Sequence, residues 1–419
     1  MKGFSRIFAS TWNTIGLSLL IIVACCSGFV VLGVTDRTDQ EARYIRVLWG
    51  AIAYLAMAMN LLLASRLSII EDIFGGLDKA YKQHRQLGVL ALVAATAHYW
   101  SPPVFFETSC STPPCNEVLR PAILAGQASL CLLLTFGALS VVRRYEIKGR
   151  QIPYNIWKTS HWIMLLVFIA ATFHVMQMPK MPLGYRNFAS ILGYLGIVAF
   201  LTYLFGHILR KRRTYRYKVV SVTKHGDIAI IEARAEGARL QHTAGQFAFL
   251  RFNKAGLQEA HPFTISSGEN DTHLQFCIKA AGDFTNLANA SLEPGDEAIV
   301  EGPYGRFGRK QSKTETWIGA GVGITPFLSM AKSQKVESGR HVSLMYLCRN
   351  PEDAIDRGAF LEFSKHPDVN YELYLSSEKG RWKCDQSIDG HLLFCGGPNL
   401  LNELQKKVKD IEAEEFKFN

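Results

Sequence analysis

The sequence predicts a multi-domain protein in which a six-helix transmembrane bundle precedes an antiparallel β-barrel and a doubly wound α/β domain. Its length of 419 residues leaves room for two or three domains at about 150 residues each. With 48% apolar and 20% charged residues, the chain does not have the composition of a disordered protein. The mean hydropathy of +0.07 averages an apolar half and a more polar half. The expected boundaries are 1–212 for the bundle, 213–312 for the barrel and 313–419 for the α/β domain.

Six apolar stretches are long enough to cross a hydrocarbon core, which needs about 20 residues. They lie at residues 14–34, 47–65, 86–106, 121–142, 156–178 and 187–209. The first is expected to be a retained span, because it is long and has no clear cleavage site. An N-terminus on the inner side places fifteen Lys and Arg residues on inner segments and six on outer ones. We therefore expect a multi-pass protein of the inner cell membrane whose N-terminus and polar half are cytoplasmic.

The net charge of +10 is concentrated at the ends of the predicted spans. There it sets the topology and meets anionic lipid headgroups, so we expect membrane lipid and no nucleic acid as a partner. The nine cysteines include no CxxC pair, which argues against a zinc or iron–sulfur site. Cys110 and Cys115 fall in a predicted outer loop, where a disulfide and two free thiols are both open.

Four histidines in the third and fifth spans are the strongest functional signal. His84 and His98 are 14 residues apart, and His161 and His174 are 13 apart. On a helix rising about 1.5 Å per residue, either spacing separates two rings by roughly 20 Å, close to the distance between the leaflet faces. Imidazole within a membrane needs a partner and is a common axial ligand of haem iron. We therefore predict two b haems, an inner one between His84 and His161 and an outer one between His98 and His174.

The helical phase of the two pairs differs. Fourteen residues at about 100° each return within roughly 40° of the same face, which suits His84 and His98. Thirteen residues miss by roughly 140°, so the fifth span is expected either to bend or to present its two rings from different sides. A di-metal site is the nearest alternative, but no Asp, Glu or Cys cluster accompanies the histidines within the spans.

Short strand-like segments separated by glycine and polar turns predict the antiparallel barrel. Its motif HPFTISS is a candidate for holding a flavin nucleotide. Thr264 and Ser266 are expected to bind a ribityl or phosphate oxygen, with Phe263 and Ile265 beside the isoalloxazine ring.

The motif IKAAGDFTNLANAS is the second candidate in the barrel. Gly282 leads into a helix whose first amides, with Thr285, are expected to neutralise a pyrophosphate. A strand followed by an ordinary capped helix is the alternative. The candidate flavin contacts are His261, Pro262, Phe263, Thr264, Ser266, Ile278, Lys279, Gly282 and Thr285.

Beyond GPYGRFG the chain alternates strands and helices, as in a doubly wound domain. Alternate glycines in WIGAGVGITPF follow an apolar strand and let a dinucleotide approach the backbone, and CGGP ends another strand. Arg349 and Arg381 suit a 2′-phosphate and favour NADPH, while NADH and ordinary surface arginines stay open. The candidate nucleotide contacts are Gly319, Gly321, Gly323, Thr325, Pro326, Arg349, Arg381, Cys395, Gly396 and Gly397.

Seven motifs in this order resemble the ferric reductase and NADPH oxidase superfamily, as a short prokaryotic-type member. They are LDKAYKQHRQLG with His98, YNIWKTSHW with His174, HPFTISS, GPYGRFG, GAGVGITPF, CGGP and EEFKFN. The resemblance implies a six-span cytochrome b with two haems, joined to a ferredoxin-reductase-like module for FAD and NAD(P)H. It also implies that Phe418 or Phe416 covers the flavin where the nicotinamide enters, and that Cys395 lies near the nicotinamide.

The function that follows from the resemblance is an NAD(P)H oxidase or ferric-chelate reductase. FAD is expected to divide the two electrons of a hydride, because haem iron accepts one at a time. Electrons then pass through the inner and outer haems to an acceptor on the outer face, either oxygen, giving superoxide, or a ferric chelate. Superoxide-generating relatives carry a further histidine where this chain has Pro102. Arg43 and Arg46 either attract an anionic acceptor or anchor the membrane interface.

Two other interpretations remain. An electron-transfer subunit would supply a periplasmic protein or a quinone, with an accessory or acceptor protein as its partner. A non-redox transporter or receptor would retain no flavin in its soluble half.

Overall fold

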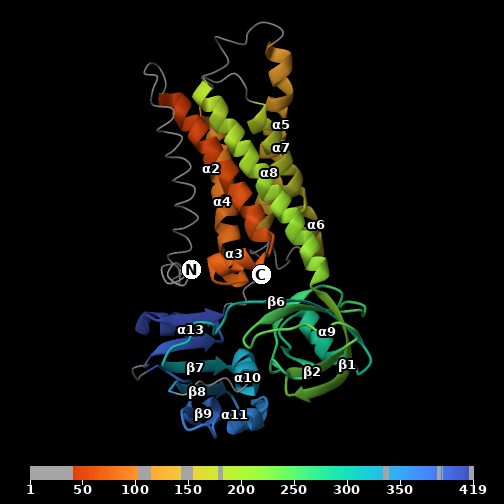
Figure 1. Cartoon of the computed structure of the whole chain (residues 1–419), viewed down its shortest axis with the longest axis vertical. Coiled ribbons are helices and arrows are strands. Elements are labelled where there is room, and N and C mark those ends of the chain that lie inside the picture. Colours follow the sequence, from red (N-terminus) through yellow and green to blue (C-terminus); the bar gives the residue numbers. More distant parts are fainter. Residues whose placement is uncertain are drawn as a thin grey trace. The chain divides into compact units, whose positions relative to one another are not determined.

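The computed structural model describes residues 41–101, 115–142, 154–177, 183–333, 339–384, 388 and 390–414. The chain divides into two compact units (Figure 1). One holds residues 1–75 and 79–208 with the last residue, and the other holds residues 76–78 and 209–418. Several features predicted from the sequence lie outside the described residues: the first span, Pro102, Cys110, Phe416 and Phe418.

The first unit consists of helices. They are α2 (Glu41–Ala64), α3 (Ser68–Phe74), α4 (Leu77–Trp100), α5 (Cys115–Val142), α6 (Tyr154–His161), α7 (Ile163–Met176) and α8 (Leu183–Arg212). Four segments are long and apolar enough to cross a membrane: Ile45–Ala64, Arg120–Ser140, Ile156–Met176 and Asn187–Arg212. These coincide with the second, fourth, fifth and sixth predicted spans, so the chain is a multi-pass membrane protein.

Helix α4 covers residues 86–100 of the third predicted span, is more polar than the other long helices and is not among the four candidate spans. The helix begins at Leu77, ahead of the predicted start of the span. Asp78 and Lys79 can lie in a helix, but their charges do not suit the hydrocarbon core, so the predicted span does not include them. It ends at Trp100. Ser101 then precedes a proline, whose ring disfavours the helical conformation of the residue before it.

The fifth predicted span is interrupted at Trp162. Helix α6 ends at His161 and α7 begins at Ile163. The amides of Trp162 and Leu165 each bond to the carbonyl three residues earlier, at 3.2 and 3.0 Å. Such a step tightens the helix locally and changes the phase of the residues that follow. The span is therefore irregular directly after the first of its two histidines.

Helix α7 is held between two neighbours. Ser129 of α5 donates a hydrogen bond to the Val167 carbonyl at 3.0 Å, and α5 packs along α7. On the side of α2, the ring of Tyr54 stacks on Phe168 with centres 5.4 Å apart. The Tyr54 hydroxyl also shares a hydrogen bond with Thr172 at 2.9 Å. These contacts position the segment that bears the second histidine of the span.

The second unit begins with a six-stranded antiparallel sheet. Its strands are β1 (Thr214–His225), β2 (Ile228–Ala235), β3 (Phe247–Phe252), β4 (His261–Thr264), β5 (Leu274–Lys279) and β6 (Glu297–Tyr304), with α9 (Asp283–Ser291) before β6. The strand order is β4-β3-β6-β1-β2-β5. An antiparallel bridge between Ile265 and Phe276 connects the two outer strands, β4 and β5. The sheet therefore closes into a barrel around a buried apolar core.

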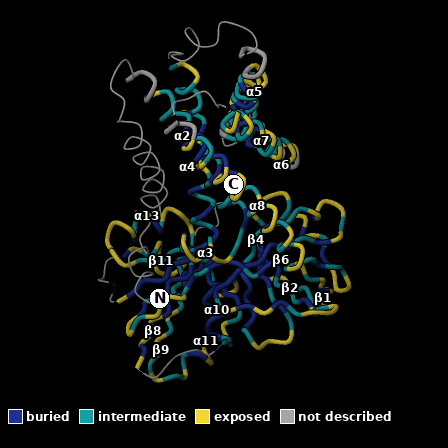
Figure 2. The backbone as a smooth tube through the Cα atoms, turned by 45° about the horizontal axis from the view of Figure 1, so that its top comes forward, coloured by how far each residue is buried: buried dark blue, intermediate teal, exposed yellow. Residues whose placement is uncertain are grey.

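A five-stranded parallel sheet follows. It contains β7 (Thr314–Ala320), β8 (His341–Cys348), β9 (Val369–Leu375), β10 (His391–Cys395) and β11 (Ile411–Glu414). The connecting helical segments are η1 (Gly321–Ile324), α10 (Thr325–Lys332), η2 (Pro351–Asp353), α11 (Arg357–Phe363), α12 (Ser376–Lys379) and α13 (Pro398–Lys407). Strand β10 is buried throughout and α10 along nearly its whole length, whereas α12 and most of α13 are more exposed (Figure 2).

The strand order identifies the place in this sheet where a dinucleotide is expected to bind. The order β11-β10-β7-β8-β9 proceeds outward from β7 in one direction and from β10 in the other. Strands β7 and β10 therefore flank the point where the strand order reverses. In doubly wound sheets, dinucleotides bind outside the carboxyl ends of the strands at such a point.

Candidate functional site

Two pairs of histidine rings face each other at two levels of the helical unit. His84 of α4 and His161 of α6 have ring centres 6.1 Å apart. His98 of α4 and His174 of α7 have ring centres 6.2 Å apart. The structure thus brings together the same pairs that the sequence predicts.

The spacing within each pair matches two imidazoles on opposite sides of one metal ion. A metal–imidazole bond is about 2 Å long and the ring centre lies about 1 Å beyond the bonded nitrogen, so two such rings have centres about 6 Å apart. Among the described residues, no group of three or more His, Cys, Asp or Glu is placed to hold a metal ion. Two imidazoles leave the remaining positions around iron to another molecule, and a porphyrin fills them. The donor set therefore fits haem b.

Each of the four rings has its Nδ1 atom engaged in a hydrogen bond of 2.8 to 3.2 Å. The partners are the Asn60 carbonyl for His84, the Arg46 carbonyl for His98, the Ala122 carbonyl for His174 and the Ser140 hydroxyl for His161. A carbonyl only accepts, so the ring nitrogens that face carbonyls carry the proton and leave Nε2 with a lone pair for a metal. Hydrogen bonds of this kind orient a ligand ring and raise its basicity.

The rings of His98 and His174 are accommodated in the same way, the first by α2 and the second by α5. A carbonyl accepts the ring Nδ1 proton, and a glycine four residues further along the helix leaves room for the ring. A Cβ atom on Gly50 would lie 2.9 Å from His98 Nδ1, and one on Gly126 would lie 2.6 Å from His174 Nδ1. Sequence analysis missed both glycines, because glycine is common in apolar spans and nothing local distinguishes these two.

The first residues of HPFTISS form a partly exposed aromatic surface. His261, Pro262 and Phe263 on β4 are partly exposed, whereas Thr264 is buried. The ring of Phe284 on α9 lies 4.1 Å from the ring of His261 and 6.2 Å from that of Phe263, between centres. Such a surface can pack against a flat heteroaromatic ring.

Three residues expected near the flavin have side chains that are buried within the protein. Ser266 is fully buried, and its hydroxyl lies 3.2 Å from Gln275 Oε1 and 3.5 Å from Cys277 Sγ. Ile265 and Ile278 are fully buried in the barrel core. Successive residues of a strand face opposite sides of the sheet, so Ile265 faces the barrel interior and Ser266 faces the other side, where Cys277 belongs to the apolar core of the parallel-sheet domain.

The start of α9 is capped by its own residues. The Thr285 hydroxyl accepts hydrogen bonds from the amides of Ala281 and Gly282, both at 2.9 Å. The predicted helix is present, but the hydroxyl serves as a cap, as in the alternative interpretation. Lys279 is exposed and forms an ion pair with Asp227 at 3.3 Å.

Two glycine-rich turns meet at the carboxyl ends of β7 and β10. A Cβ atom on Gly323 would lie 2.3 Å from the Cys395 carbonyl oxygen and 3.0 Å from the Gly396 amide nitrogen. A Cβ atom on Gly319 would lie 2.9 Å from the backbone of η1. Gly321 has a φ of 57°, a conformation that glycine adopts without strain. The two sequence motifs thus form one structure at the point where the strand order reverses.

The helices that follow these turns both begin with a proline in their first turn. Thr325 and Pro326 open α10, and the Thr325 hydroxyl donates a hydrogen bond to the Val322 carbonyl at 3.0 Å. Gly397 precedes Pro398 at the start of α13, with open space around the position of a Cβ atom. Free amides at such helix starts can receive phosphate oxygens.

Cys395 lies at the end of β10 as a buried thiol. Burial raises its pKa well above the usual value, and the nearby Glu414 carboxylate raises it further. The Cys395 Sγ atom lies 4.0 Å from Glu414 Oε2. The neutral thiol can line a site, but it is not set up as a nucleophile or a base. The sequence pattern did not indicate Glu414, because the contact depends on the pairing of β10 with β11.

The two candidate arginines lie in different surroundings. Arg349 follows β8 directly and is exposed. Arg381 is also exposed, but its guanidinium donates to Glu403 of α13 at 2.8 Å. An exposed ion pair of this kind contributes little to stability, so it can exchange for another anion.

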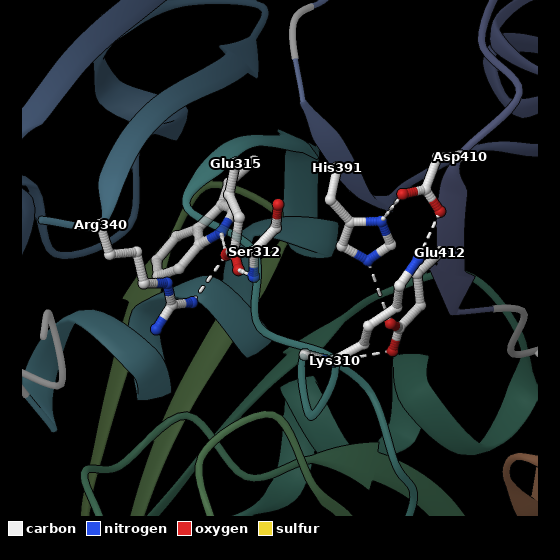
Figure 3. Close-up of polar contacts among 9 residues, drawn as sticks. Lys310, Ser312, Glu315, Arg340, His391, Asp410 and Glu412 are labelled. Atoms are coloured by element: carbon white, nitrogen blue, oxygen red, sulfur yellow. Dashed lines mark hydrogen bonds and ion pairs between the residues drawn. The ribbon is translucent and has the colours of Figure 1, made fainter. Parts of the chain in front are cut away.

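A second polar cluster lies at the amino ends of the parallel strands (Figure 3). Nδ1 of His391 lies 3.1 Å from Asp410, and its Nε2 lies 3.4 Å from Glu412. Lys310 pairs with Asp410 at 2.6 Å, and the Gly308 amide donates to Glu412 at 2.9 Å. Burial lowers the pKa of His391, but the hydrogen bond to Glu412 and the charge of Asp410 outweigh burial, so the pKa is raised. The cluster ties the segment after the barrel to the parallel sheet and was not predicted from the sequence.

Two known protein families match parts of the chain that contain some of these candidate residues. The family described as "Ferric reductase like transmembrane component" matches residues 49–172, and "FAD-binding domain" matches residues 214–307. NADPH oxidase 1 of Mus musculus is 28% identical over 238 residues, and dual oxidase 1 of Rattus norvegicus is 26% identical over 239 residues. The chain belongs to the ferric reductase and NADPH oxidase superfamily. Of the four paired histidines, all but His174 lie within the first matched region.

The family resemblance covers only part of these large relatives. The matched region is 49% of this chain and 38% of the mouse protein, and 54% of this chain and 14% of the rat protein. A solved flavohemoglobin from Malassezia yamatoensis, determined with FAD and heme bound, has a similar fold with a TM-score of 0.50 at 17% identity. That comparison covers 90% of this chain and 99% of the flavohemoglobin. The members of the superfamily that the chain resembles are oxidoreductases, and the candidate flavin motifs fall within the matched FAD-binding region.

Proposed function

We propose that the protein carries electrons from cytoplasmic NADPH across the membrane to an acceptor at the outer face. The observation that carries this proposal is the presence of two imidazole pairs, 6.1 and 6.2 Å apart, at two levels of the same helices. The matched FAD-binding region supports an electron supply, and the membrane-spanning helices support a path across the bilayer. The excess of Lys and Arg on one side supports the orientation.

When bound, FAD and two b haems supply the redox chemistry, since flavin takes up a hydride and haem iron exchanges single electrons. The residues of the chain hold these groups in place. His84 and His161 would hold the inner haem, and His98 and His174 would hold the outer one. Fourteen residues of α4 separate the two levels by about 20 Å, which spans most of the hydrocarbon core.

On the soluble side, the glycine turns allow the backbone to approach a dinucleotide. Gly319 lies at the end of β7, Gly321 and Gly323 lie in the turn that follows, and the helix start at Thr325 offers amides to the phosphates of the dinucleotide. Arg349 is exposed beside the same edge and suits the 2′-phosphate of NADPH. The neutral Cys395 thiol lines the nicotinamide position, with Phe418 or Phe416 as the aromatic cover implied by the family.

The flavin is assigned to the barrel. His261, Pro262 and Phe263 present a partly exposed face for its ring, and Thr264 follows them on the same strand. The amides of the first turn of α9, from Asp283 onward, face its pyrophosphate in this proposal. The barrel side chains of Ser266 and Ile278 are left out because the structure buries them.

The acceptor is a small molecule on the outer side. Oxygen is favoured by the relatives named NADPH oxidase and dual oxidase, and a ferric chelate by the description of the matched transmembrane family. The protein would be placed in the inner cell membrane with its N-terminus and soluble unit in the cytoplasm, as the charge distribution suggests.

The first experiment measures haem in the purified full-length protein and in histidine variants. His84→Ala is expected to remove the inner haem and His98→Ala the outer one, so that each variant retains one of two. His207→Ala is the control, because His207 on α8 packs against Trp162 and belongs to neither pair. Absence of b-type absorption from the parent protein, or unchanged haem in both histidine variants, would contradict the proposal.

The second experiment identifies the acceptor. The full chain is reconstituted in sealed vesicles with its soluble unit outward, and NADPH is added outside. Oxygen or a ferric chelate is the only acceptor in the lumen of each preparation. Reduction of either one supports self-contained transmembrane transfer, whereas reduction of neither favours a partner-dependent subunit.

A further inference from the structure

The four histidines differ in what accepts their Nδ1 proton. Three rings face main-chain carbonyls, which no side-chain substitution removes. His161 faces a side-chain hydroxyl, that of Ser140 on α5, at 3.2 Å. This is the only one of the four acceptors that the choice of residue controls directly.

The Ser140 hydroxyl is already committed by its other contacts. It donates its own proton to the Phe136 carbonyl at 3.1 Å. It also accepts a hydrogen bond from Trp157 Nε1 at 3.2 Å. Since a hydroxyl has one proton, the oxygen must act as the acceptor toward His161 as well. That arrangement places the proton on His161 Nδ1 and leaves Nε2 with its lone pair.

Trp157 acts on the same ring in a second way. Its indole stacks on the His161 imidazole, with ring centres 5.1 Å apart and planes 24° apart. Trp157 therefore limits the rotation of the ring and at the same time competes for the oxygen that accepts the ring proton. Trp157 lies one turn before His161 on α6, which keeps both contacts on one face of the helix.

We propose that Ser140 is the positioning residue of the inner haem ligand, and that Ser140 and Trp157 together set the reduction potential of the inner site. This inference rests on the proposed function, because it takes the His84 and His161 pair as haem ligands. A hydrogen bond from Nδ1 increases the electron density on Nε2, and a more basic ligand stabilises ferric over ferrous iron. Weakening that bond therefore raises the reduction potential.

The lengths of the hydrogen bonds extend the argument to both sites. At the inner level the Nδ1 contacts of His84 and His161 are both 3.2 Å. At the outer level those of His98 and His174 are both 2.8 Å. Shorter bonds to carbonyls make the outer imidazoles the more basic ligands. The inner site is consequently the one with the higher potential of the two.

The test is a spectroelectrochemical titration of the full-length holoprotein and four variants. Ser140→Ala removes the acceptor and raises the higher of the two potentials, while the lower one stays in place. A hydrogen-bond partner of a metal-bound histidine is typically worth at least tenfold in metal affinity. A tenfold change confined to the ferric form shifts the reduction potential by about 59 mV for a one-electron couple. Ser140→Thr keeps the hydroxyl and retains the parent potential.

Trp157→Phe provides a shift in the opposite direction. It keeps an aromatic ring against His161 but deletes the competing N–H group, so the Ser140 oxygen accepts more fully from His161 and the higher potential falls. Ser129→Ala is the matched control, because Ser129 is also on α5 and bonds to the Val167 carbonyl without touching a histidine. It leaves both potentials unchanged.

Each outcome has a defined meaning. Unchanged potentials in Ser140→Ala, an equal shift in Ser129→Ala, or a rise in Trp157→Phe would overturn the inference. If Ser140→Ala fails to fold or retain haem, the Ser140→Thr and Trp157→Phe titrations decide alone. If His161→Ala removes haem while the Ser140 and Trp157 variants match the parent, only this inference fails. A parent protein without haem would remove the proposed function as well.

Discussion

Gly126→Ala is expected to weaken the outer haem site, although alanine normally stabilises a helix. The new Cβ atom would lie 2.6 Å from His174 Nδ1 and 2.9 Å from its Cε1 atom. The ring must then move away from α5, and its 2.8 Å hydrogen bond to the Ala122 carbonyl is stretched or lost. The substitution therefore acts on a proposed iron ligand without removing it.

The size of the effect follows from three contributions. Overpacking costs about 1–3 kcal/mol, and the loss of a hydrogen bond costs about 0.5–1.5 kcal/mol. Replacing glycine by alanine in a helix offsets about 1 kcal/mol of this. The net loss of about 0.5–3.5 kcal/mol corresponds to roughly 2- to 300-fold weaker binding at the outer site.

Transfer of haem from the purified protein to an excess of apomyoglobin measures this loss directly. One of the two haems is expected to leave faster in Gly126→Ala, and the other to leave at the parent rate. Gly137→Ala is the matched control on the same helix, because its Cβ atom would make only ordinary contact, 3.7 Å from Leu92. Equal transfer rates in the two glycine variants would refute the reasoning.

Three further predictions concern the soluble unit. Gly323→Ala is expected to lower kcat/KM for NADPH roughly 5- to 150-fold, because its Cβ atom would lie 2.3 Å from a main-chain oxygen and overpacking costs about 1–3 kcal/mol. Arg349→Ala is expected to lower kcat/KM for NADPH at least roughly tenfold and leave NADH unaffected, since a hydrogen bond to a charged group is worth about 1.5–3 kcal/mol. Arg381→Ala has a smaller effect because its guanidinium already pairs with a carboxylate. The raised pKa of His391 means that its protonated form stabilises the folded state, fully so below its ordinary value of 6.5. Stability is then lost as the pH rises through the raised pKa, by at most about 1.4 kcal/mol per pH unit, and His391→Gln removes this dependence in thermal release of flavin.

Each of these has an outcome that would contradict it. Gly397→Ala is the control for the first, because its Cβ atom would meet open space, and equal kinetics in the two glycine variants would count against tight contact between the turns. A parallel loss with NADPH and NADH in Arg349→Ala would show that the arginine does not read the 2′-phosphate. An unchanged pH profile in His391→Gln would exclude the imidazole as the titrating group.

The histidine pairs show how far the sequence could be interpreted. Their spacing along two spans predicted the pairing and the two levels, because helix rise and helix phase are local properties. It left open whether the fifth span bends or presents its two rings from different sides. The structure shows the same pairing and an interruption at Trp162. The ring environment was not predictable, because Gly50, Gly126 and Ser140 reach the histidines from other helices.

The flavin motif shows the limit on the soluble side. The residue types in HPFTISS predicted a strand with polar side chains near a ligand, and β4 is present. Whether each side chain faces outward depends on how the barrel closes through the bridge between Ile265 and Phe276. That closure turns Ile265 into the barrel core, and the next residue, Ser266, which the sequence presented as a ligand contact, is buried on the opposite side of the sheet beside Cys277.

The membrane and soluble parts, four of the six predicted spans, the family and the identity of the paired histidines follow from the sequence alone. They depend on composition, on periodicity and on motifs in which neighbouring residues act together. The acceptors that orient the imidazoles, the contact between the glycine turns of β7 and β10, and the His391 cluster depend on the folded arrangement. Hydrogen bonds and steric contacts act over only a few ångströms, so they exist only once packing has brought distant segments together.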